Sequence, residues 1–510
     1  MNQSIEHFVP VYNCIGKMLL LKRRFPLTQT PLKRYSSAST IYALSSAYGK
    51  CGVSVIRVSG PQTRKCLRSI IGSTTLKERF AHLKALYHPK TNEMIDKALV
   101  LWFPGPSSFT GEDCCEFQVH GSLAVISAMF DALSQIPGLR PAKPGEFTKR
   151  AFFGNKLDLT EVEGLADLIH AETEAQRKQA LQQSNGSLSR LYDKWRKCLI
   201  RCAAHLEAYI DFGEDENIED DVIFQLSKEL INVQKEINAH LNDQRQGEML
   251  RDGVRTCIIG APNVGKSSFL NIMFQRDLAI VSPIAGTTRD PIESTLSFGG
   301  YPLRIVDTAG LRAFTNDIIE QKGIQKTKKC LEDADLVFLI TDAAHFREKS
   351  SLISSNIDSY CSEYLKELDL NHEDILKNKR VILIVNKIDL MSSDEIQVLT
   401  NLPTLIGISC KDKCNMKKFM DNLENILREL CGSPSAEAPR LTHARYRVHL
   451  ERCVDHIREY LEEYSPDVYP DMAISALKLR NAIKDIERIT GHVSTDDILD
   501  VVFKDFCIGK

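Results

Sequence analysis

The spacing of hydrophobic residues changes along the chain, and each change marks a different kind of structure. Residues 53–58 and 98–102 alternate apolar and polar side chains between glycine and proline turns, which is typical of strands. Residues 36–155 are therefore predicted to form an α+β segment. From Leu159 the apolar period becomes helical and continues to about Arg245.

The helical pattern is interrupted once and resumes beyond a second strand-containing segment. An acidic run at residues 211–221 is most simply a solvated loop. Apolar stripes on either side of it lie at Val162, Leu165, Ala166, Ile169, Leu226, Leu230, Val233, Ile237 and Leu241. After a linker at Gly432, a further stripe includes Val448, Ile457, Leu461, Leu477 and Ile486. We therefore expect one helical domain, residues 156–250 and 432–510, into which residues 251–431 are inserted.

Residues 251–431 contain three polar motifs, the first two of which directly follow apolar runs at residues 254–259 and 303–306. The motifs are Gly260-Ala-Pro-Asn-Val-Gly-Lys-Ser267, Asp307-Thr-Ala-Gly310 and Asn386-Lys-Ile-Asp389. A glycine-rich turn followed by Lys-Ser is typical of a loop whose backbone N–H groups bind phosphates. The three motifs in this order predict a P-loop nucleotide-binding domain.

The motifs give individual side chains expected roles. Lys266 would reach the β- and γ-phosphates, and Ser267 would bind Mg²⁺. Asp307 would lie on the Mg²⁺ side, and the N–H of Gly310 would contact the γ-phosphate. The carboxylate of Asp389 can accept from N1–H and N2–H₂ of guanine, a pair of donors that adenine lacks. The chain is therefore predicted to bind and hydrolyse GTP.

Two features distinguish this segment from many GTPases. Leu311 occupies the position where many of them have a glutamine that orients the attacking water. Residues 282–290 contain paired threonines and carbonyls suited to cations, and residues 409–411 suit a guanine-contacting loop. The residues expected to contact GTP are Asn263, Val264, Gly265, Lys266, Ser267, Ser268, Ser282, Thr287, Thr288, Asp307, Thr308, Ala309, Gly310, Asn386, Lys387, Asp389, Ser409, Cys410 and Lys411.

Composition indicates an intracellular protein of several domains. Its 510 residues suggest roughly three domains, and 43% hydrophobic with 26% charged residues is ordinary for globular protein. The longest apolar stretches are strand-sized, so no transmembrane helix is predicted. Fifteen cysteines without a Cys-x-x-Cys indicate reduced thiols. The closest pairs, which lack histidines or partner pairs at zinc spacing, are Cys198/Cys202, Cys410/Cys414 and Cys114/Cys115.

The first 35 residues have a composition of their own. No acidic residue lies between Glu6 and Glu78, whereas six basic residues precede position 36. A basic, hydroxyl-rich, nearly acid-free segment predicts a mitochondrial transit peptide at residues 1–35 and a protein of the matrix. The alternative is a disordered basic tail that binds RNA. Removal of the segment leaves an acidic chain, so net charge does not favour broad nucleic-acid binding.

Several stretches outside the nucleotide motifs carry a family resemblance. They are Phe109-Thr-Gly-Glu-Asp113, Pro144-Gly-Glu-Phe-Thr-Lys-Arg-Ala151, Asn155-Lys-Leu-Asp-Leu159 and the terminal Phe506-Cys-Ile-Gly-Lys510. The tail is the most specific of them, and it is no prenylation signal because Gly509 and Lys510 follow Ile508. Over nearly its whole length after residue 40, the chain resembles the tRNA-modification GTPase family known as MnmE or TrmE, in its mitochondrial form.

This resemblance implies a homodimeric enzyme that acts with a flavin-dependent partner of the MnmG or GidA type. Such complexes add an aminomethyl-type group, carboxymethylaminomethyl or a related one, to C5 of the wobble uridine of certain mitochondrial tRNAs. The one-carbon unit comes from 5-formyl- or 5,10-methylene-tetrahydrofolate. The implied fold is a Ras-like P-loop G domain inserted in an α-helical domain, preceded by an α+β domain for folate binding and dimerisation.

Family positions that contact folate also have counterparts in this chain. They fall on Arg57, Glu116, Lys156 and Lys510. Cationic side chains suit the carboxylates of a folate, and an acidic one suits the amide-like edge of its pterin. The chain departs from the family at Cys51, where the family has a glycine, and at Ser122, where a second glycine is usual. Both departures concern details of the pocket.

The resemblance also implies a substitute for the missing glutamine. Family members use a K⁺ ion as the activating charge. Its ligands here would be Asn263, Ser282, Ile284 and Thr287. Thr288 would join Ser267 on Mg²⁺, and Glu320 would orient water through a bridge. The catalytic candidates are thus Glu320, Lys266 and Cys507, and the alternative for Cys507 is a merely exposed tail thiol.

Two other classes of function compete with this interpretation. A ribosome-assembly GTPase would be a binding protein, and Gly49-Lys-Cys-Gly52 matches the Gly-x-x-Gly loop of a KH module. That loop must join two helices, whereas here it leads into an alternating run, and a second G domain is absent from the sequence. The other class is a folate-dependent one-carbon transferase with a regulatory G domain.

Overall fold

The computed structural model describes most of the chain. The described residues are 39–72, 76–212, 221–275, 294–305, 328–349, 357–392, 395–396, 399, 404–435, 438–463, 472–492, 502–503, 506 and 509. The chain forms two compact units, residues 1–162 with 490–510 and residues 163–489, and each is described by itself. The domain boundaries expected from the sequence stay predictions.

The first unit is built on a six-stranded mixed sheet with the strand order β3-β4-β5-β2-β1-β6. Neighbouring strands are antiparallel except β1 and β6, which are parallel. The alternating runs predicted as strands lie in β2 and β4. The elements are β1 Thr40–Leu44, β2 Cys51–Ser59, α2 Thr63–Ile71, β3 His82–Tyr87, β4 Met94–Phe103, β5 Cys114–Gly121, α3 Leu123–Ser134, β6 Leu139–Pro141 and α4 Glu146–Phe153.

The core of this sheet lies under two helices. Leu67 of α2 and Met129 of α3 pack with Ile56, Val100 and Phe117, which belong to three adjacent strands. Side chains two apart in a strand share a face, so each strand contributes alternate residues to this core. The alternation visible in the sequence therefore has its origin in one covered face of the sheet.

Residues close to the C-terminus pack on the same unit. Phe503 and Phe506 are buried, and the ring of Phe503 lies 6.3 Å from that of Phe152 in α4. The hydroxyl of Ser45, just after β1, donates to the carbonyl of Gly509 at 2.9 Å. The end of the chain is thus held against the segments around β1 and α4.

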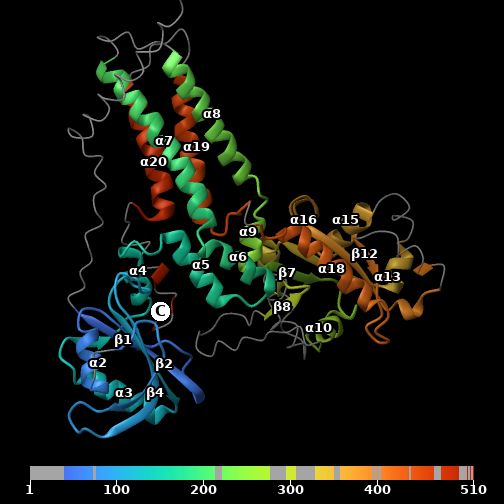
Figure 1. The fold of residues 1–510 in the computed structure, drawn as a ribbon. Coiled ribbons are helices and arrows are strands. Elements are labelled where there is room, and N and C mark those ends of the chain that lie inside the picture. Colours follow the sequence, from blue (N-terminus) through green and yellow to red (C-terminus); the bar gives the residue numbers. More distant parts are fainter. Residues whose placement is uncertain are drawn as a thin grey trace, which may run out of the picture. The chain divides into compact units, whose positions relative to one another are not determined.

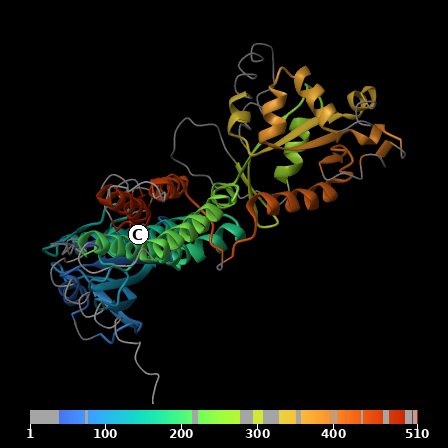
Figure 2. The ribbon, with the colours of Figure 1, turned by 90° about the horizontal axis from the view of Figure 1, so that it is seen from above.

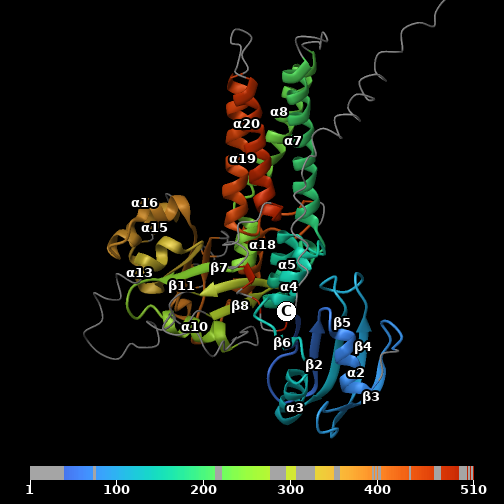
Figure 3. The ribbon, with the colours of Figure 1, turned by 90° about the vertical axis from the view of Figure 1, so that its left-hand side faces the viewer.

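The second unit contains four long helices that share one hydrophobic core (Figures 1 and 3). They are α7 Ser187–Phe212, α8 Asp221–Leu241, α19 Ala444–Glu463 and α20 Met472–Thr490. Trp195 and Leu230 from the first pair pack in the same cluster as Ile457 and Ile486 from the second pair. Segments that precede and follow the nucleotide motifs therefore complete a single core.

Two of the helical core positions predicted from the sequence are wrong. Val448 and Leu477 are 45% and 52% exposed. The core side of these helices is instead occupied by residues such as Tyr446, Cys453 and Ala476. Because a tyrosine, a cysteine and an alanine fill the inner positions, the large aliphatic residues did not mark the buried face.

The part of the chain between α8 and α19 forms a second six-stranded sheet, with the order β12-β11-β10-β7-β9-β8. Its strands are parallel except β8, which pairs antiparallel with β9. Strand β7 has the bounds expected from the apolar pattern. The elements are β7 Val254–Ile259, α10 Lys266–Gln275, β8 Ser294–Phe298, β9 Tyr301–Ile305, β10 Leu336–Asp342, α13 Ala343–Glu348, α15 Ile357–Glu367, α16 His372–Asn378, β11 Arg380–Asn386, the 3₁₀ helix η1 Ile388–Leu390, β12 Leu405–Gly407 and α18 Met416–Cys431.

Helices cover both faces of this sheet (Figure 2). On one face, Phe269 of α10 and Phe419 of α18 pack edge to face with Phe338 of β10. On the other, Tyr360 of α15 and Ile375 of α16 belong to a separate apolar cluster. Burial on both faces explains why the parallel strands are nearly continuous apolar runs. Among the described helices, none combines the length and the apolar character that crossing a membrane requires.

Ion pairs and a hydrogen bond link the shorter helices α5 Leu159–His170, α6 Glu174–Ser184 and α9 Gln246–Asp252 to one another and to α19. Arg445 makes two 2.7 Å contacts with the carboxylate of Glu163. Asp167, one turn further along α5, pairs at 2.8 Å with Arg251, just before β7. The amide of Gln176 in α6 also donates to the carbonyl of Arg251. Paired charges of this kind fix orientation because each would be costly if left alone.

Candidate nucleotide site

The carboxyl ends of four parallel strands bring the predicted nucleotide residues together. Strand β7 leads into residues 260–265, β10 ends at Asp342, β11 ends at Asn386, and β12 leads to Ser409. In open α/β sheets this edge is where ligands bind, because the loops of parallel strands emerge on the same side. The first and third motifs, far apart in sequence, therefore lie at one edge of the sheet.

The phosphate loop has the conformation that its residue types predict. Gly260 and Gly265 have positive φ angles of 155° and 99°. A side chain on Gly260 would collide with the carbonyl of Ile340, and one on Gly265 with the amide of Asn386. Asn263, with φ at 61°, adopts the left-handed conformation that asparagine tolerates better than most residues. Only glycines allow the loop to approach its neighbours this closely.

Lys266 begins α10 and turns back over the loop. Its ammonium donates to the carbonyls of Gly260 at 2.8 Å and Ala261 at 2.7 Å. Burial lowers its pKa from the ordinary lysine value. The loop itself is fixed by Tyr364, whose hydroxyl accepts from the N–H of Ala261 and donates to the carbonyl of Ile340, both at 2.9 Å. A cation is thus held ready beside the phosphate-binding turn.

Asn386 joins the phosphate loop to the predicted guanine loop. Its side-chain amide donates to the carbonyl of Val264 at 2.8 Å, and its side-chain oxygen accepts from the N–H of Cys410 at 3.1 Å. The residue is almost fully buried. Both hydrogen bonds would be expensive to leave unmade in such a position. The two parts of the nucleotide site are therefore positioned by one side chain.

The acceptor predicted for guanine is held by its neighbours. The hydroxyl of buried Ser409 donates to Oδ1 of Asp389 at 2.7 Å and accepts from the N–H of Asp412 at 3.2 Å. Asp389 itself is exposed. Lys387, with φ at 63°, reaches Oδ2 of Asp342 at 2.9 Å. A fixed carboxylate open to solvent suits the two N–H donors of guanine.

Asp342 also belongs to this site, although it was not identified as a candidate from the sequence. Burial opposes ionisation of its carboxyl, but the N–H of His345 and the ammonium of Lys387 more than compensate and lower its pKa. Asp342 also caps α13, since its side chain accepts from His345. The sequence feature that could have identified Asp342 is an acidic residue at the end of the apolar run that forms β10.

Part of the predicted site lies outside the described residues. Of the predicted set, the structure describes Asn263, Val264, Gly265, Lys266, Ser267, Ser268, Asn386, Lys387, Asp389, Ser409, Cys410 and Lys411. Outside the described residues lie Ser282, Ile284, Thr287, Thr288, Asp307, Thr308, Ala309, Gly310, Glu320, Cys507 and Lys510. Their roles stay predictions.

Two of the predicted folate residues meet in the first unit. Arg57 of β2 and Glu116 of β5 are directly opposite in the sheet, and Nε of Arg57 donates to Oε1 of Glu116 at 2.9 Å. The guanidinium of Arg57 lies 5.4 Å from the centre of the Phe109 ring and 5.8 Å from that of Phe147. A charged pair beside aromatic rings is suited to a planar polar ligand.

The other two predicted folate residues are not joined to this pair by a described contact. Lys156 is exposed, and its side chain passes beside Gly111, two residues beyond Phe109. Lys510 lies outside the described residues. The departure at Cys51 has a local explanation, since its thiol packs on Gly121, where any side chain would collide with it. The glycine retained at 121 makes room for the sulfur.

Residues of the Phe109–Asp113 and Pro144–Ala151 stretches form an ion-pair network. Arg150 contacts Glu112 at 2.9 Å and Glu146 at 3.1 Å, and Arg140 contacts Glu146 at 2.8 Å. Burial opposes ionisation of Glu146, yet hydrogen bonds from Arg140, the N–H of Lys143 and Arg150 bring its pKa down to about 2. These charged residues therefore support the sheet that carries Arg57 and Glu116, a role that the sequence alone did not reveal.

Two protein-family models match this chain, and together they extend over most of its length. The MnmE helical domain matches residues 159–507, and the N-terminus of the GTP-binding protein TrmE matches residues 40–156. A solved structure of the cytosolic domain of the T. maritima FeoB iron transporter is 17% identical and covers 47% of this chain and 98% of that one, with a TM-score of 0.21. This TM-score is too low to indicate a shared fold.

Three curated relatives extend over nearly the whole chain. The mitochondrial 5-taurinomethyluridine-[tRNA] synthase subunit GTPB3 of Danio rerio is 45% identical over 97% of each chain. The protein of the same name from Homo sapiens is 43% identical over 93% of this chain and 94% of its own. The tRNA modification GTPase MnmE of Rickettsia bellii is 42% identical over 92% of this chain and 100% of its own. With the nucleotide site described above, these matches show that the chain belongs to the MnmE family of tRNA-modification GTPases.

Proposed function

We propose that this protein is a mitochondrial GTPase that modifies C5 of the wobble uridine of tRNA together with a flavin-dependent MnmG-type partner. The observation that carries the proposal is the guanine site, in which Ser409 holds Asp389 and Asn386 joins this site to the phosphate loop. Relatives named as GTPB3 or MnmE, at 42–45% identity, support the tRNA substrate and the mitochondrial location. The predicted transit peptide supports the matrix.

Residues of this chain provide a nucleotide cradle that fits GTP with Mg²⁺. Lys266 offers its ammonium beside the loop, and Ser267 follows in the first turn of α10, where a hydroxyl ligand for Mg²⁺ belongs. Thr288 is the proposed second protein ligand. When bound, Mg²⁺ neutralises charge that develops on the phosphates.

A second cation is proposed to replace the water-orienting glutamine. Asn263 is exposed on the phosphate loop, and its amide oxygen is a neutral, hard donor suited to a monovalent cation. The other proposed K⁺ ligands are Ser282, Ile284 and Thr287. Glu320 is proposed to orient the attacking water, because Leu311 has no polar group to do so.

The K⁺ proposal predicts a cation-dependent rate. GTP turnover is expected to be faster in K⁺ than in Na⁺ by roughly tenfold or more, since the smaller ion fits ligands spaced for K⁺ poorly. Turnover measured in the two salts at equal ionic strength tests this. Asn263→Lys should abolish the difference between the salts by placing its own ammonium there. Equal rates for the unaltered protein in both salts would remove K⁺ from the mechanism.

A tetrahydrofolate derivative is the proposed source of the one-carbon unit. The Arg57–Glu116 pair beside Phe109 and Phe147 offers a cation, an anion and aromatic faces, which suit the glutamate tail and the pterin. Lys156, Lys510 and Cys507 are proposed to complete this site. Bound there, the folate supplies a carbon at the oxidation level of formyl or methylene. We also propose that the protein is a homodimer.

The test of the proposed function is the nucleoside content of mitochondrial tRNA. In cells that lack this gene, mass spectrometry is expected to show loss of the C5 substituent on wobble uridine. The relatives' name makes the taurinomethyl group the first product to measure. Re-expression of the intact chain should restore it. An unchanged substituent would contradict the proposal and favour a ribosome-assembly role or a one-carbon transferase.

The ribosome-assembly alternative loses its one specific feature in the structure. Its KH interpretation required the loop at residues 49–52 to join two helices. Instead, the loop connects towards strand β2, which begins at Cys51 and pairs with β5. A Gly-x-x-Gly loop in a hairpin lacks the helical frame that clamps a nucleotide backbone.

A further inference from the structure

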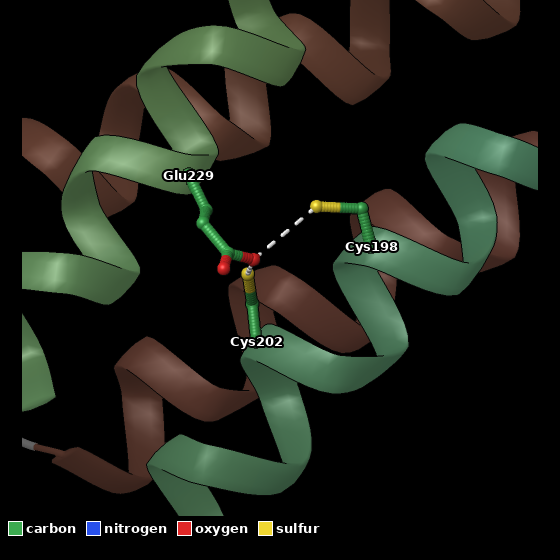
Figure 4. Close-up of side chains that lie close together, drawn as sticks. All are labelled: Cys198, Cys202 and Glu229. Carbon is green, nitrogen blue, oxygen red and sulfur yellow. Dashed lines mark hydrogen bonds between the residues drawn. The ribbon is translucent and has the colours of Figure 1, made fainter.

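Two thiols and a carboxylate meet between the long helices, away from the nucleotide motifs. Cys198 and Cys202 are one turn apart on α7, and Glu229 lies on α8 (Figure 4). Residues four apart occupy the same face of a helix. Cys202 belongs to the core that α7 and α8 share, so this face of α7 is turned towards α8.

The spacing of the three ligand atoms suits one tetrahedral ion. Oε2 of Glu229 lies 3.5 Å from the sulfur of Cys198 and 3.8 Å from that of Cys202. All three ligand atoms lie within 4.8 Å of one another. With Zn–S near 2.3 Å and Zn–O near 2.1 Å, a tetrahedral zinc centre separates sulfur from oxygen by about 3.6 Å. The side chains would therefore need little movement to bind a cation.

We propose that Cys198, Cys202 and Glu229 form a binding site for a zinc-class divalent cation. Two thiolates and one carboxylate are ligands that borderline-soft Zn²⁺ accepts, and a water molecule would complete four-coordination. The side chain of Glu229 is 46% exposed, which leaves the ion a route from solvent. One Zn²⁺ replaces the two thiol protons, and both protons leave to solvent.

The carboxylate of Glu229 already attracts one cationic side chain of the protein. Arg201 is the competing cation, since its Nε lies 3.6 Å from Oε2 of Glu229. It is exposed and has room to turn away.

The same helix pair contains a matched control. Glu236 lies on α8, is 45% exposed, and pairs with Lys194 of α7 at 2.8 Å. It therefore resembles Glu229 with Arg201 in exposure and in charge pairing. Its further partner, however, is the indole N–H of Trp195 at 2.7 Å rather than a thiol. Removal of the Glu229 carboxylate would thus remove a proposed metal ligand, whereas removal of the Glu236 carboxylate would remove only a charge from the same helix.

Titration of the reduced full-length protein with Co²⁺, a spectroscopic substitute for Zn²⁺, tests the proposal. We expect a near-ultraviolet thiolate-to-cobalt band with visible bands of a tetrahedral ion, saturating at one Co²⁺ per chain and bleached by Zn²⁺. Cys198→Ser should abolish the charge-transfer band, and Glu229→Gln should weaken Co²⁺ binding by about tenfold or more. Glu236→Gln, and Cys414→Ser as a control for an unrelated exposed thiol, should leave the titration unchanged.

A variant that is expected to strengthen metal binding keeps the test informative if loss of a thiol disturbs folding. Arg201→Gln removes the competing cation and should tighten Co²⁺ binding, an effect that mere damage to the bundle would not produce. Circular dichroism and GTP turnover of Cys198→Ser should match the unaltered protein, because the phosphate loop is built from other residues. A charge-transfer band that persists in Cys198→Ser, or Co²⁺ binding that Arg201→Gln weakens or leaves unchanged, would overturn the site.

Discussion

Asp389→Asn is expected to lower the affinity of the protein for GTP by on the order of 10³-fold while creating affinity for xanthosine triphosphate. Guanine presents donors at N1 and N2, and the carboxylate accepts both. An amide at position 389 keeps one acceptor but offers an N–H where the N2 amino group needs an acceptor. Xanthine has a carbonyl at C2, so the new amide can donate to it and still accept from N1–H.

The measurement is the affinity of fluorescent GTP and XTP analogues for both proteins. Ser409 should keep its role, because its hydroxyl can donate to the amide oxygen as it does to Oδ1 of Asp389. Asp412→Asn is the matched control, because Asp412 lies in the loop of Ser409 and its hydrogen bond to Ser409 uses the backbone N–H rather than the carboxylate. Unchanged GTP affinity in Asp389→Asn would mean that another group recognises guanine.

Deletion of Cys507–Lys510 is expected to abolish tRNA modification while leaving GTP turnover within about twofold of the intact protein. The described part of the tail packs in the first unit, through Phe503, Phe506 and the Gly509 carbonyl. The phosphate loop and the guanine loop both lie in the second unit. The deletion removes the proposed folate residues Cys507 and Lys510, whereas every described residue of the candidate nucleotide site remains.

Both activities should be measured on the same truncated protein. Ser45→Ala provides a milder variant, because it removes the hydrogen bond to Gly509 but no tail residue. A decrease in modification by a few-fold is expected from it. Wild-type modification by the truncated protein would exclude the tail from the chemistry. Loss of GTP turnover would show that the tail is needed for folding or assembly.

The nucleotide motifs could be predicted because their ligand restricts residue type strongly. Close approach to phosphate needs glycine at positions 260 and 265, and guanine needs an acceptor such as Asp389. Strand β7 has the predicted bounds because a strand covered on both faces is a continuous apolar run. The hydrogen bonds that position these groups were not predictable, since Asn386 and Val264 are far apart in sequence.

Other features were missed because their physical cause does not lie in local spacing. In α19 and α20, Tyr446 and Ala476 face the core while Val448 and Leu477 do not, so hydrophobicity alone gave the wrong face. The thiols of Cys198 and Cys202 looked isolated because their third neighbour, Glu229, belongs to the next helix. Only the packing of α7 on α8 brings these groups together.

The helical core shared by the two ends of the second unit also sets an order of events during synthesis. Helices α7 and α8 are made early, but their partners α19 and α20 follow only after the whole second sheet. Until then, large apolar side chains such as Trp195 and Leu230 lack the covering that α19 and α20 provide. The strands and helices from β7 to α18 form cores of their own in the meantime. Apolar surface left uncovered during synthesis favours aggregation, and α19 and α20 are the segments that cover it in the finished unit.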